Sequence, residues 1–361
     1  MTAKAKVTLD IGPMLDDQWT GIPVFTRRLA QALLRHEGID VEFAFQLTRV
    51  PYALVLSAIK AGTGTFLREA LFSVDSNRYD IVDRNTPMLF PSAKNACTTG
   101  GREASTVHDL STLLMPEFHE EGNVIHHMHN FKSDLATDEA VFCVSEATRA
   151  SLELHYPSIG SKTRVLYQYV DWPDSFEAMD RNLPALQLGR YAVVLGTVEP
   201  RKNLGLLVRA LSMPKVKRSE IRFVVIGKTG WKMDRFLAGL TPRDTSRLVF
   251  TGFVSEFVKY RLLRHAEFLV YPSFYEGFGI PALEAMSLGK PVLASMTSSF
   301  PEVIGKAGVY FDPFSASEFD AAFDEVSHKR KQRELTAEAV KCAAAFNWQR
   351  MAGPVVDWAT G

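Results

Sequence analysis

The stretch YPSFYEGFGIPALEAMSLGKPVLASMTSSFPE, residues 271–302, decides the expected fold and places the expected site. The segment AEFLVYPS, residues 266–273, overlaps the start of this stretch. It is a short apolar run that ends in Pro-Ser, as is typical of a buried strand. Pro281 favours the first turn of a helix because its missing N–H is not needed there, so we expect a helix to begin near Pro281. The order is therefore strand, glycine-containing turn, helix.

This order predicts an anion-binding site that holds two glutamates. Glycines let the backbone approach a ligand, and the free N–H groups and positive dipole end of the helix attract negative charge. Glu276 lies in the turn and Glu284 in the first turn of the helix, so both can face one ligand that carries phosphates and hydroxyls. Taken singly, Glu276 is equally well a solvated loop charge, and Glu284 a residue that complements the helix dipole.

Length and composition indicate an ordinary globular protein of two domains. The chain has 361 residues, 46% of them hydrophobic and 23% charged. The 41 basic and 41 acidic residues balance, which gives no support for nucleic acid as a partner. No signal peptide and no apolar run of membrane-spanning length is recognisable, so we expect a cytoplasmic location. The three cysteines have neither disulfide nor zinc-site spacing.

Apolar runs alternate with helical spacing, which predicts an α/β fold with parallel sheets covered on both faces. In the second half the expected strands are YAVVLG, IRFVVIG, RLVFTG, EFLVYPS, KPVLAS and AGVYFDP. In the first half the expected strands are 6–11, 41–46, one near 80–83, 104–110, 140–145 and 164–170, and the expected helices are 22–36, 51–60, 65–72, 123–136 and 146–156. Residues 171–189 hold two prolines and no clear period, so we expect the linker there.

The block EGFGIPALEAMSLGKPV, followed by SSFPEVIG, resembles the Glu-x7-Glu donor-site signature of the retaining glycosyltransferases with the GT-B fold, the group 1 family usually numbered four. The resemblance implies two Rossmann-like domains that face a central cleft, residues 1–172 for the acceptor and 189–340 for a nucleotide sugar. It also implies that residues 341–361 form a terminal helix crossing back onto the first domain. Within the signature, Glu276 would reach the transferred sugar and Glu284 the ribose.

Two cations follow the first strand of the second domain. In TVEPRKNLG, Arg201 and Lys202 precede a helix expected to open near Asn203, and at a strand end they could take up charge on a departing diphosphate. The simpler alternative is a solvated pair on a surface helix. The resemblance to the family's Arg-Lys-Asn element favours the site.

Further positions come from the resemblance alone. His108 in TVHDL would lie by the donor sugar, although a packed or capping histidine is the common alternative; Gly21, with Gly12, would approach the phosphates. Ser145 and Glu146 resemble the family's Ser-Glu, but a helix cap explains them equally well. The expected catalytic residues are Glu276, Arg201, Lys202 and His108, and the expected donor-binding residues are Gly21, Gly12, Gly227, Phe253, Val254, Gly277, Phe278, Gly279, Ile280 and Glu284.

We expect no metal and no cofactor other than the nucleotide sugar itself. The chain has no D-x-D, and His126, His127 and His129 lack cysteines or carboxylates at ligand spacing. A G-x-S-x-G nucleophile motif is also absent.

The donor and acceptor stay open. TGIPVFTRRL and HDLSTLLMPEF resemble mannosyltransferases of bacterial surface polysaccharides, which favours GDP-mannose over UDP-sugars and a glycan or lipid-linked acceptor. A lipid-linked acceptor would bring residues 49–60 to the inner membrane surface, although that segment could equally be core. A GT-B epimerase or hydrolase would use the same donor without an acceptor. A two-domain sugar-binding protein would share the paired halves, but such proteins are normally exported.

Overall fold

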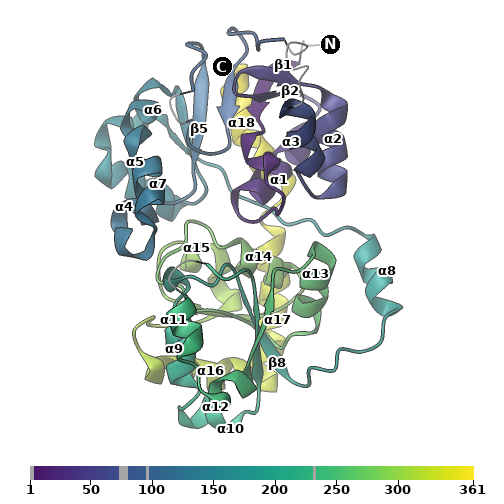
Figure 1. The fold of residues 1–361 in the computed structure, drawn as a ribbon, viewed down its shortest axis with the longest axis vertical. Helices are drawn as coiled ribbons and strands as arrows, with labels where there is room; N and C mark the ends of the chain where they lie inside the picture. Colours follow the sequence, from purple (N-terminus) through teal and green to yellow (C-terminus); the bar gives the residue numbers. More distant parts are fainter. Residues whose placement is uncertain (1–3, 73–79, 95–96, 231–232) are drawn as a thin grey trace. The chain divides into compact units, whose positions relative to one another are not determined.

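The computed structural model describes residues 4–72, 80–94, 97–230 and 233–361 (Figure 1). The chain divides into two compact units. The first contains Met1–Pro116, Glu121–Tyr169 and Phe346–Gly361, and the second contains Glu117–Glu120 and Val170–Ala345. Both are α/β units, as the alternating pattern predicts.

The first unit is built on a sheet of seven strands in the order β3-β2-β1-β4-β5-β6-β7. Every strand pair is parallel except β2 with β3. The strands are β1 Ala5–Asp10, β2 Ile39–Phe45, β3 Thr48–Val50, β4 Met88–Phe90, β5 Glu103–Val107, β6 Ala140–Cys143 and β7 Thr163–Val165. Its helices before the crossing to the second unit are α1 Ile22–Arg35, α2 Tyr52–Ala61, α3 Thr65–Phe72, α4 Ser111–Leu114, α5 Glu121–His129, α6 Phe131–Thr137 and α7 Glu146–His155, with 3-10 turns η1 Gly12–Leu15 and η4 Pro157–Lys162.

The terminal helix α18 (Trp348–Thr360) returns to the first unit, which confirms that expectation. Trp358 is 1% exposed and packs edge-on against Phe142 of β6, with ring centroids 6.0 Å apart. Arg102 donates to the carbonyl of Trp358 at 2.6 Å. The helix begins later than residue 341 because Asn347 caps it, its side chain accepting from the N–H of Arg350.

The second unit is built on a six-stranded, fully parallel sheet in the order β10-β9-β8-β11-β12-β13. Its strands are β8 Tyr191–Leu195, β9 Arg222–Ile226, β10 Leu248–Gly252, β11 Leu269–Tyr271, β12 Val292–Ser295 and β13 Gly308–Phe311. All six predicted strands are confirmed. The helices are α8 Ser175–Arg181, α9 Leu204–Ala210, α10 Pro214–Arg218, α11 Asp234–Ala238, α12 Pro242–Arg247, α13 Glu256–His265, α14 Ile280–Ser287, α15 Phe300–Ile304, α16 Ala316–Ser327 and α17 Lys329–Ala344, with 3-10 turns η5 Pro200–Lys202 and η6 Gly305–Ala307; η3 Pro116–Phe118 precedes them in the chain and spans the division between the units.

The strand order reverses direction at β8. From β8 the chain first adds β9 and β10 on one side and then returns to add β11, β12 and β13 on the other. Sheets of this type bind ligands beyond the carboxyl ends of the two strands that flank the reversal. In this unit those strands are β8 and β11.

Several sequence-based predictions in the first half are wrong in detail. Ile81 forms only an isolated bridge with Thr48, and the strand lies instead at Met88–Phe90, whose three residues are too few to show a period. The helix predicted over 123–136 is two helices separated at Asn130. Separately from these two predictions, residues 171–189, where we expect the linker, contain α8 and fall within the second unit.

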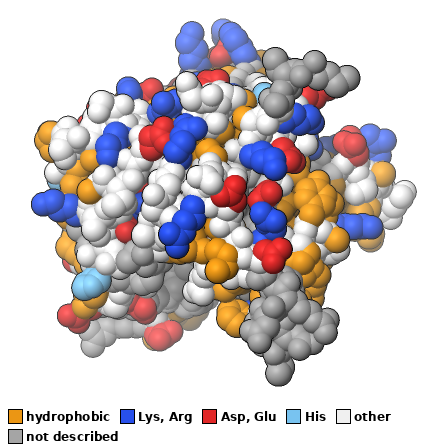
Figure 2. All heavy atoms as spheres, turned by 90° about the horizontal axis from the view of Figure 1, so that it is seen from above, with side chains coloured by type: hydrophobic (Ala, Val, Ile, Leu, Met, Phe, Trp, Pro, Cys, Tyr) orange, Lys and Arg blue, Asp and Glu red, His pale blue; other side chains and the backbone are white. Residues whose placement is uncertain are grey.

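On the face drawn in Figure 2, basic and acidic side chains are interspersed, in keeping with the balanced composition. Within the described residues, no helix combines the length and the apolar character needed to cross a membrane.

Candidate active site

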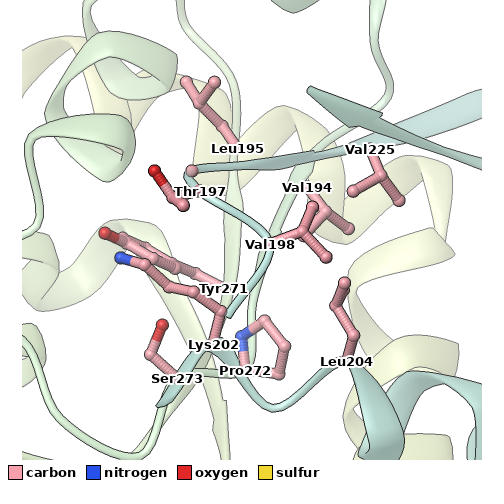
Figure 3. Close-up of a pocket in the computed structure, with 11 residues that line it drawn as sticks. Val194, Leu195, Thr197, Val198, Lys202, Leu204, Val225, Tyr271, Pro272 and Ser273 are labelled. Carbon is pink, nitrogen blue, oxygen red and sulfur yellow. The ribbon is translucent and has the colours of Figure 1, made fainter. Parts of the chain in front are cut away.

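A pocket lies at the point where the second sheet reverses its strand order (Figure 3). It is lined by residues from the ends of β8, β9 and β11 and from the segments that follow β8 and β11: Val194, Leu195, Gly196, Thr197, Val198, Lys202, Leu204, Val225, Tyr271, Pro272 and Ser273. The pocket therefore occupies the place where this class of sheet holds its ligand.

Gly196, at the end of β8, leaves space for the side chain of Lys202. Its φ is +142°, and a Cβ there would lie 3.2 Å from Lys202 Cε. Lys202 Nζ is 5.4 Å from the centre of the Tyr271 ring, and the two side chains run side by side with their polar ends pointing the same way (Figure 3). A larger residue at position 196 would displace the lysine.

Asn203 fixes the turn that carries both cations. Its φ is +54°, a left-handed conformation that asparagine tolerates better than most residues. Its side-chain amide donates to the carbonyls of Pro272 and Pro313, at 3.1 and 2.8 Å. The turn after β8 is thereby tied to the segments after β11 and β13, and α9 begins at Leu204, close to the predicted position.

Glu276 is the centre of a buried ion cluster. Its carboxylate lies 2.5 Å from Lys202 Nζ and 3.1 Å from Arg201 Nη1, and the residue is 8% exposed. Burial alone would raise the pKa of Glu276, but the charges of Arg201 and Lys202 outweigh it and lower the pKa to about 2. The structure thus brings three of the four predicted catalytic residues together.

Arg201 has further partners that hold its guanidinium. It donates to the carbonyl of Tyr275 at 2.6 Å and pairs with Glu199 at 2.9 Å, and its own carbonyl accepts from the N–H of Phe274 at 3.0 Å. Two cations therefore meet two carboxylates in this cluster. The alternative of a solvated surface pair is wrong, because Arg201 and Lys202 side chains are only 12% and 13% exposed.

The turn after Glu276 is held by two serines of the segment before α15. Ser298 accepts from the N–H of Glu276 at 3.0 Å, and Ser299 donates to the carbonyls of Glu276 and Phe278 at 2.9 and 3.0 Å. The side chain of Phe278 is buried, so only its backbone could face a ligand. Gly279 has φ +95° and precedes α14, which begins at Ile280.

Glu284 lies one turn into α14 in a separate buried pair. Its carboxylate is 2.7 Å from Lys259 Nζ of α13, and its side chain is 2% exposed. Burial and pairing exclude the interpretation of Glu284 as a surface charge that only complements the helix dipole.

Other predicted donor-binding positions in this unit lie around the sheet. Gly227 has φ +146°, and a Cβ there would lie 2.0 Å from the carbonyl oxygen of Gly196, so close packing of two strand ends requires the glycine. Phe253 and Val254 lie in the turn between β10 and α13, and Phe253 is 43% exposed.

His108, Gly12 and Gly21 belong to the first unit. His108 Nε2 lies 2.8 Å from the carbonyl oxygen of Pro91, and its ring meets Phe25 edge-on at 4.7 Å. Burial lowers the pKa of His108, so the ring is neutral at pH 7. A neutral ring that donates through Nε2 keeps Nδ1 as an acceptor.

The two glycines differ in their surroundings. Gly21 caps α1 at φ +55° and ψ −114°, a conformation that glycine alone adopts readily, whereas the N–H of Gly12 donates to Asp10 Oδ2 at 3.0 Å. Ser145 caps α7, its Oγ accepting from the N–H of Thr148 at 3.0 Å, which accounts for that serine without a ligand.

Metal-ligating groups of three or more histidines, cysteines or carboxylates do not occur among the described residues. Of the histidines considered from sequence, the side chain of His126 lies outside the described part of the chain.

Sequence reasoning missed the residues that hold the site residues in place. Gly196 and Ser298 stood in quoted stretches, but only their contacts reveal their roles. Lys259 carried no signal, since one lysine on a polar helix looks like any other.

Comparison with known proteins identifies the family. The family described as "Glycosyl transferases group 1" matches residues 176–341. The O-antigen chain mannosyltransferase B of Escherichia coli is 33% identical over 259 residues, covering 69% of this chain and 67% of that protein. The serotype-specific mannosyltransferase WbdA of Escherichia coli is 28% identical over 264 residues, covering 69% of this chain and 32% of WbdA.

One solved structure is similar to the fold of this protein over nearly the whole chain. The sucrose-phosphate synthase of Thermosynechococcus elongatus is similar with a TM-score of 0.70 and 18% identity, covering 98% of both chains. At that identity the likeness concerns the fold, and it agrees with the two parallel-sheet units described above. The chain belongs to the glycosyl transferases group 1 family and is a glycosyltransferase with the GT-B fold.

Proposed function

We propose that the protein transfers mannose from GDP-mannose to a glycan or lipid-linked acceptor, with retention of configuration and without a metal ion. The observation that carries this proposal is the cluster of Arg201, Lys202 and Glu276 at the strand-order reversal of the second sheet. The O-antigen chain mannosyltransferase B and WbdA, two of the relatives that align with the chain, support mannose as the sugar.

Arg201 and Lys202 bind the diphosphate. Their charges are offset by Glu199 and Glu276, so bound phosphates must take over part of this pairing. As the glycosidic bond breaks, negative charge grows on the leaving diphosphate, and preorganised cations in a buried site stabilise that charge strongly. This arrangement supports metal independence, because two protein cations supply the charge that a metal supplies elsewhere.

Glu276 faces the sugar as an anion. With a pKa near 2 it holds no proton at neutral pH, so it acts by charge and hydrogen bonding and not as a general acid. The sugar gains positive charge in an oxocarbenium-like transition state, and a fixed carboxylate beside it is then worth more than in the ground state.

Glu284 binds the ribose hydroxyls, and His108 accepts a hydrogen bond from a sugar hydroxyl through Nδ1. Both roles require groups that accept hydrogen bonds. The carboxylate oxygens of Glu284 and the unprotonated Nδ1 of the neutral His108 ring are such acceptors. Phe253 is exposed next to α13 and offers an apolar face for the base.

The first unit, which we propose binds the acceptor, has exposed apolar side chains on α2 that could contact a membrane. Tyr52 and Leu56 on α2 are 51% and 39% exposed, and both stand in the segment 49–60 that would approach a lipid-linked acceptor. We propose peripheral contact through this helix only together with such an acceptor.

A thermal-shift screen with GDP-mannose, other GDP-sugars and UDP-sugars tests the donor, since a ligand at a hundred times its dissociation constant adds about 2.7 kcal/mol of stability. We expect GDP-mannose to give the largest shift. A larger shift with a UDP-sugar would identify a UDP-sugar-dependent transferase instead. Product analysis with and without acceptor then separates transfer from an epimerase or a hydrolase, which would turn over the donor alone.

A further inference from the structure

The surroundings of Glu284 contain a second, partly buried charge that sequence motifs do not mark. Lys259, on the first turn of α13, places its Nζ 2.7 Å from Glu284 Oε1. The two side chains are 18% and 2% exposed. Burying a carboxylate this deeply is costly unless a partner compensates the lost hydration.

Trp172 covers this ion pair and ties it to the helix. Lys259 Nζ lies 5.4 Å from the centre of the Trp172 ring, a cation–π distance. The indole N–H of Trp172 donates to Ser287 Oγ at 2.9 Å, and that hydroxyl donates to the carbonyl of Glu284 at 2.8 Å. Trp172, Ser287, Glu284 and Lys259 thus form a closed ring of contacts, in which Ser287 holds the backbone and Lys259 the carboxylate of Glu284.

Trp172 stands in the segment that enters the second unit after Tyr169, and this segment is firmly held. The Trp172 ring meets Tyr260 edge-on at 5.3 Å, and Phe176 of α8 meets Phe257 in the same way at 5.3 Å. One turn later Asp180 accepts from Arg261 at 2.7 Å. Aromatic packing and a buried ion pair therefore fasten this segment to the helix that carries Lys259.

We propose that Lys259, covered by Trp172, is a positioning residue for Glu284. Lys259 holds one oxygen of the Glu284 carboxylate, so that the group meets the ribose hydroxyls in one orientation. The inference rests on the proposed function of Glu284. It adds that nucleotide affinity depends on a lysine of α13 and on the segment that joins the two units.

The test is calorimetric titration of the full chain with GDP and, in parallel, with UDP. For the nucleotide that the wild type binds, we expect Lys259→Met to weaken binding about 10-fold, the size typical of outer partners of binding groups, with a smaller change in kcat. Lys259→Arg should restore most of the affinity because it keeps the charge. Trp172→Phe, which keeps the ring but loses the N–H, should weaken binding about threefold, within the size of one lost hydrogen bond.

Coupling separates positioning from a general loss of stability. In the Glu284→Gln background, Lys259→Met should cause no further weakening, because the group that it positions is already altered. Lys215→Met is the matched control: Lys215 also pairs with a carboxylate, Asp324 at 3.0 Å, but between α10 and α16, so nucleotide affinity should not change. If Lys259→Met does not fold, Lys259→Gln carries the same test, since it removes the charge but keeps a donor.

The outcomes distinguish the positioning role of Lys259 from the proposed ribose-binding role of Glu284. If Glu284→Gln weakens the nucleotide and the Lys259 variants do not, the positioning role is wrong and the ribose role stands. If Lys259→Met weakens binding equally with and without Glu284→Gln, Lys259 acts independently of Glu284 and the inference is overturned. If the wild type binds neither nucleotide, the proposed function fails, and the inference fails with it.

Discussion

The two glutamates of the second unit are both buried and both paired with cations, but their surroundings differ in kind. Glu276 meets two cations from the turn after β8, and one of these, Arg201, is shared with Glu199. Glu284 meets Lys259, whose ammonium lies over the indole ring of Trp172. We propose that the first cluster exchanges partners when phosphates bind, and that Glu276 serves the chemistry while Glu284 serves nucleotide binding.

The largest effect on activity should come from Arg201 and Lys202, the cations that pair with Glu276. If they stabilise charge that grows only as the diphosphate leaves, Arg201→Ala or Lys202→Ala should lower kcat on the order of 10²-fold or more, with a smaller change in donor KM. Steady-state kinetics on folded variants measure this. An unchanged kcat would remove both residues from the chemistry and leave the cluster as a structural ion network.

The same cluster should make stability depend on pH. The pKa of Glu276 falls from an ordinary 4.5 to about 2 in the folded chain. The carboxylate therefore contributes stability that is fully present above pH 4.5 and is lost as the pH falls toward 2. Glu276→Gln removes the carboxylate partner of Lys202 and leaves Arg201 paired with Glu199, and it should cost about 3 kcal/mol at pH 7.

That cost should shrink by roughly 1.4 kcal/mol between pH 7 and pH 3.5. Denaturant titrations at both pH values check the difference. Glu325→Gln, which removes a half-exposed partner of Lys331, is the control and should change stability little at either pH. A cost for Glu276→Gln that is the same at both pH values would mean that the cations do not lower the pKa of Glu276.

The smallest effect should be that of a chelator. Because Arg201 and Lys202 provide the positive charge, EDTA should leave the rate of sugar transfer nearly unchanged. Loss of activity with EDTA, and its recovery with Mg²⁺ or Mn²⁺, would show that Arg201 and Lys202 alone do not stabilise the leaving diphosphate.

The second unit could be predicted well from sequence because its strands are uniform. Runs such as VVL in β8 and FVV in β9 are buried on both faces, so their composition marks them as parallel strands. In the first unit, β4 has only three residues, and a short apolar run of that length does not differ from a loop that packs inward.

The site could be predicted as a set of residues but not as a network. The glycines and glutamates of 276–284 stand together in the chain, so spacing reveals them. The pairing of Glu276 with Lys202 joins positions 74 apart, and that of Glu284 with Lys259 joins positions 25 apart. Such contacts depend on which strands are neighbours and how helices lie beside them, and one sequence without relatives does not contain that information.

Calorimetric titration of Glu276→Gln and Glu284→Gln with the nucleoside diphosphate tests the central division most directly. The ribose does not change during the reaction, so Glu284→Gln should weaken the diphosphate by roughly 1 to 3 kcal/mol and affect kcat less. Glu276→Gln should cut kcat and leave diphosphate binding no weaker, because it removes a competitor for Arg201 and Lys202. Equal weakening in both variants, or weakening only in Glu276→Gln, would contradict the assignment of the two glutamates.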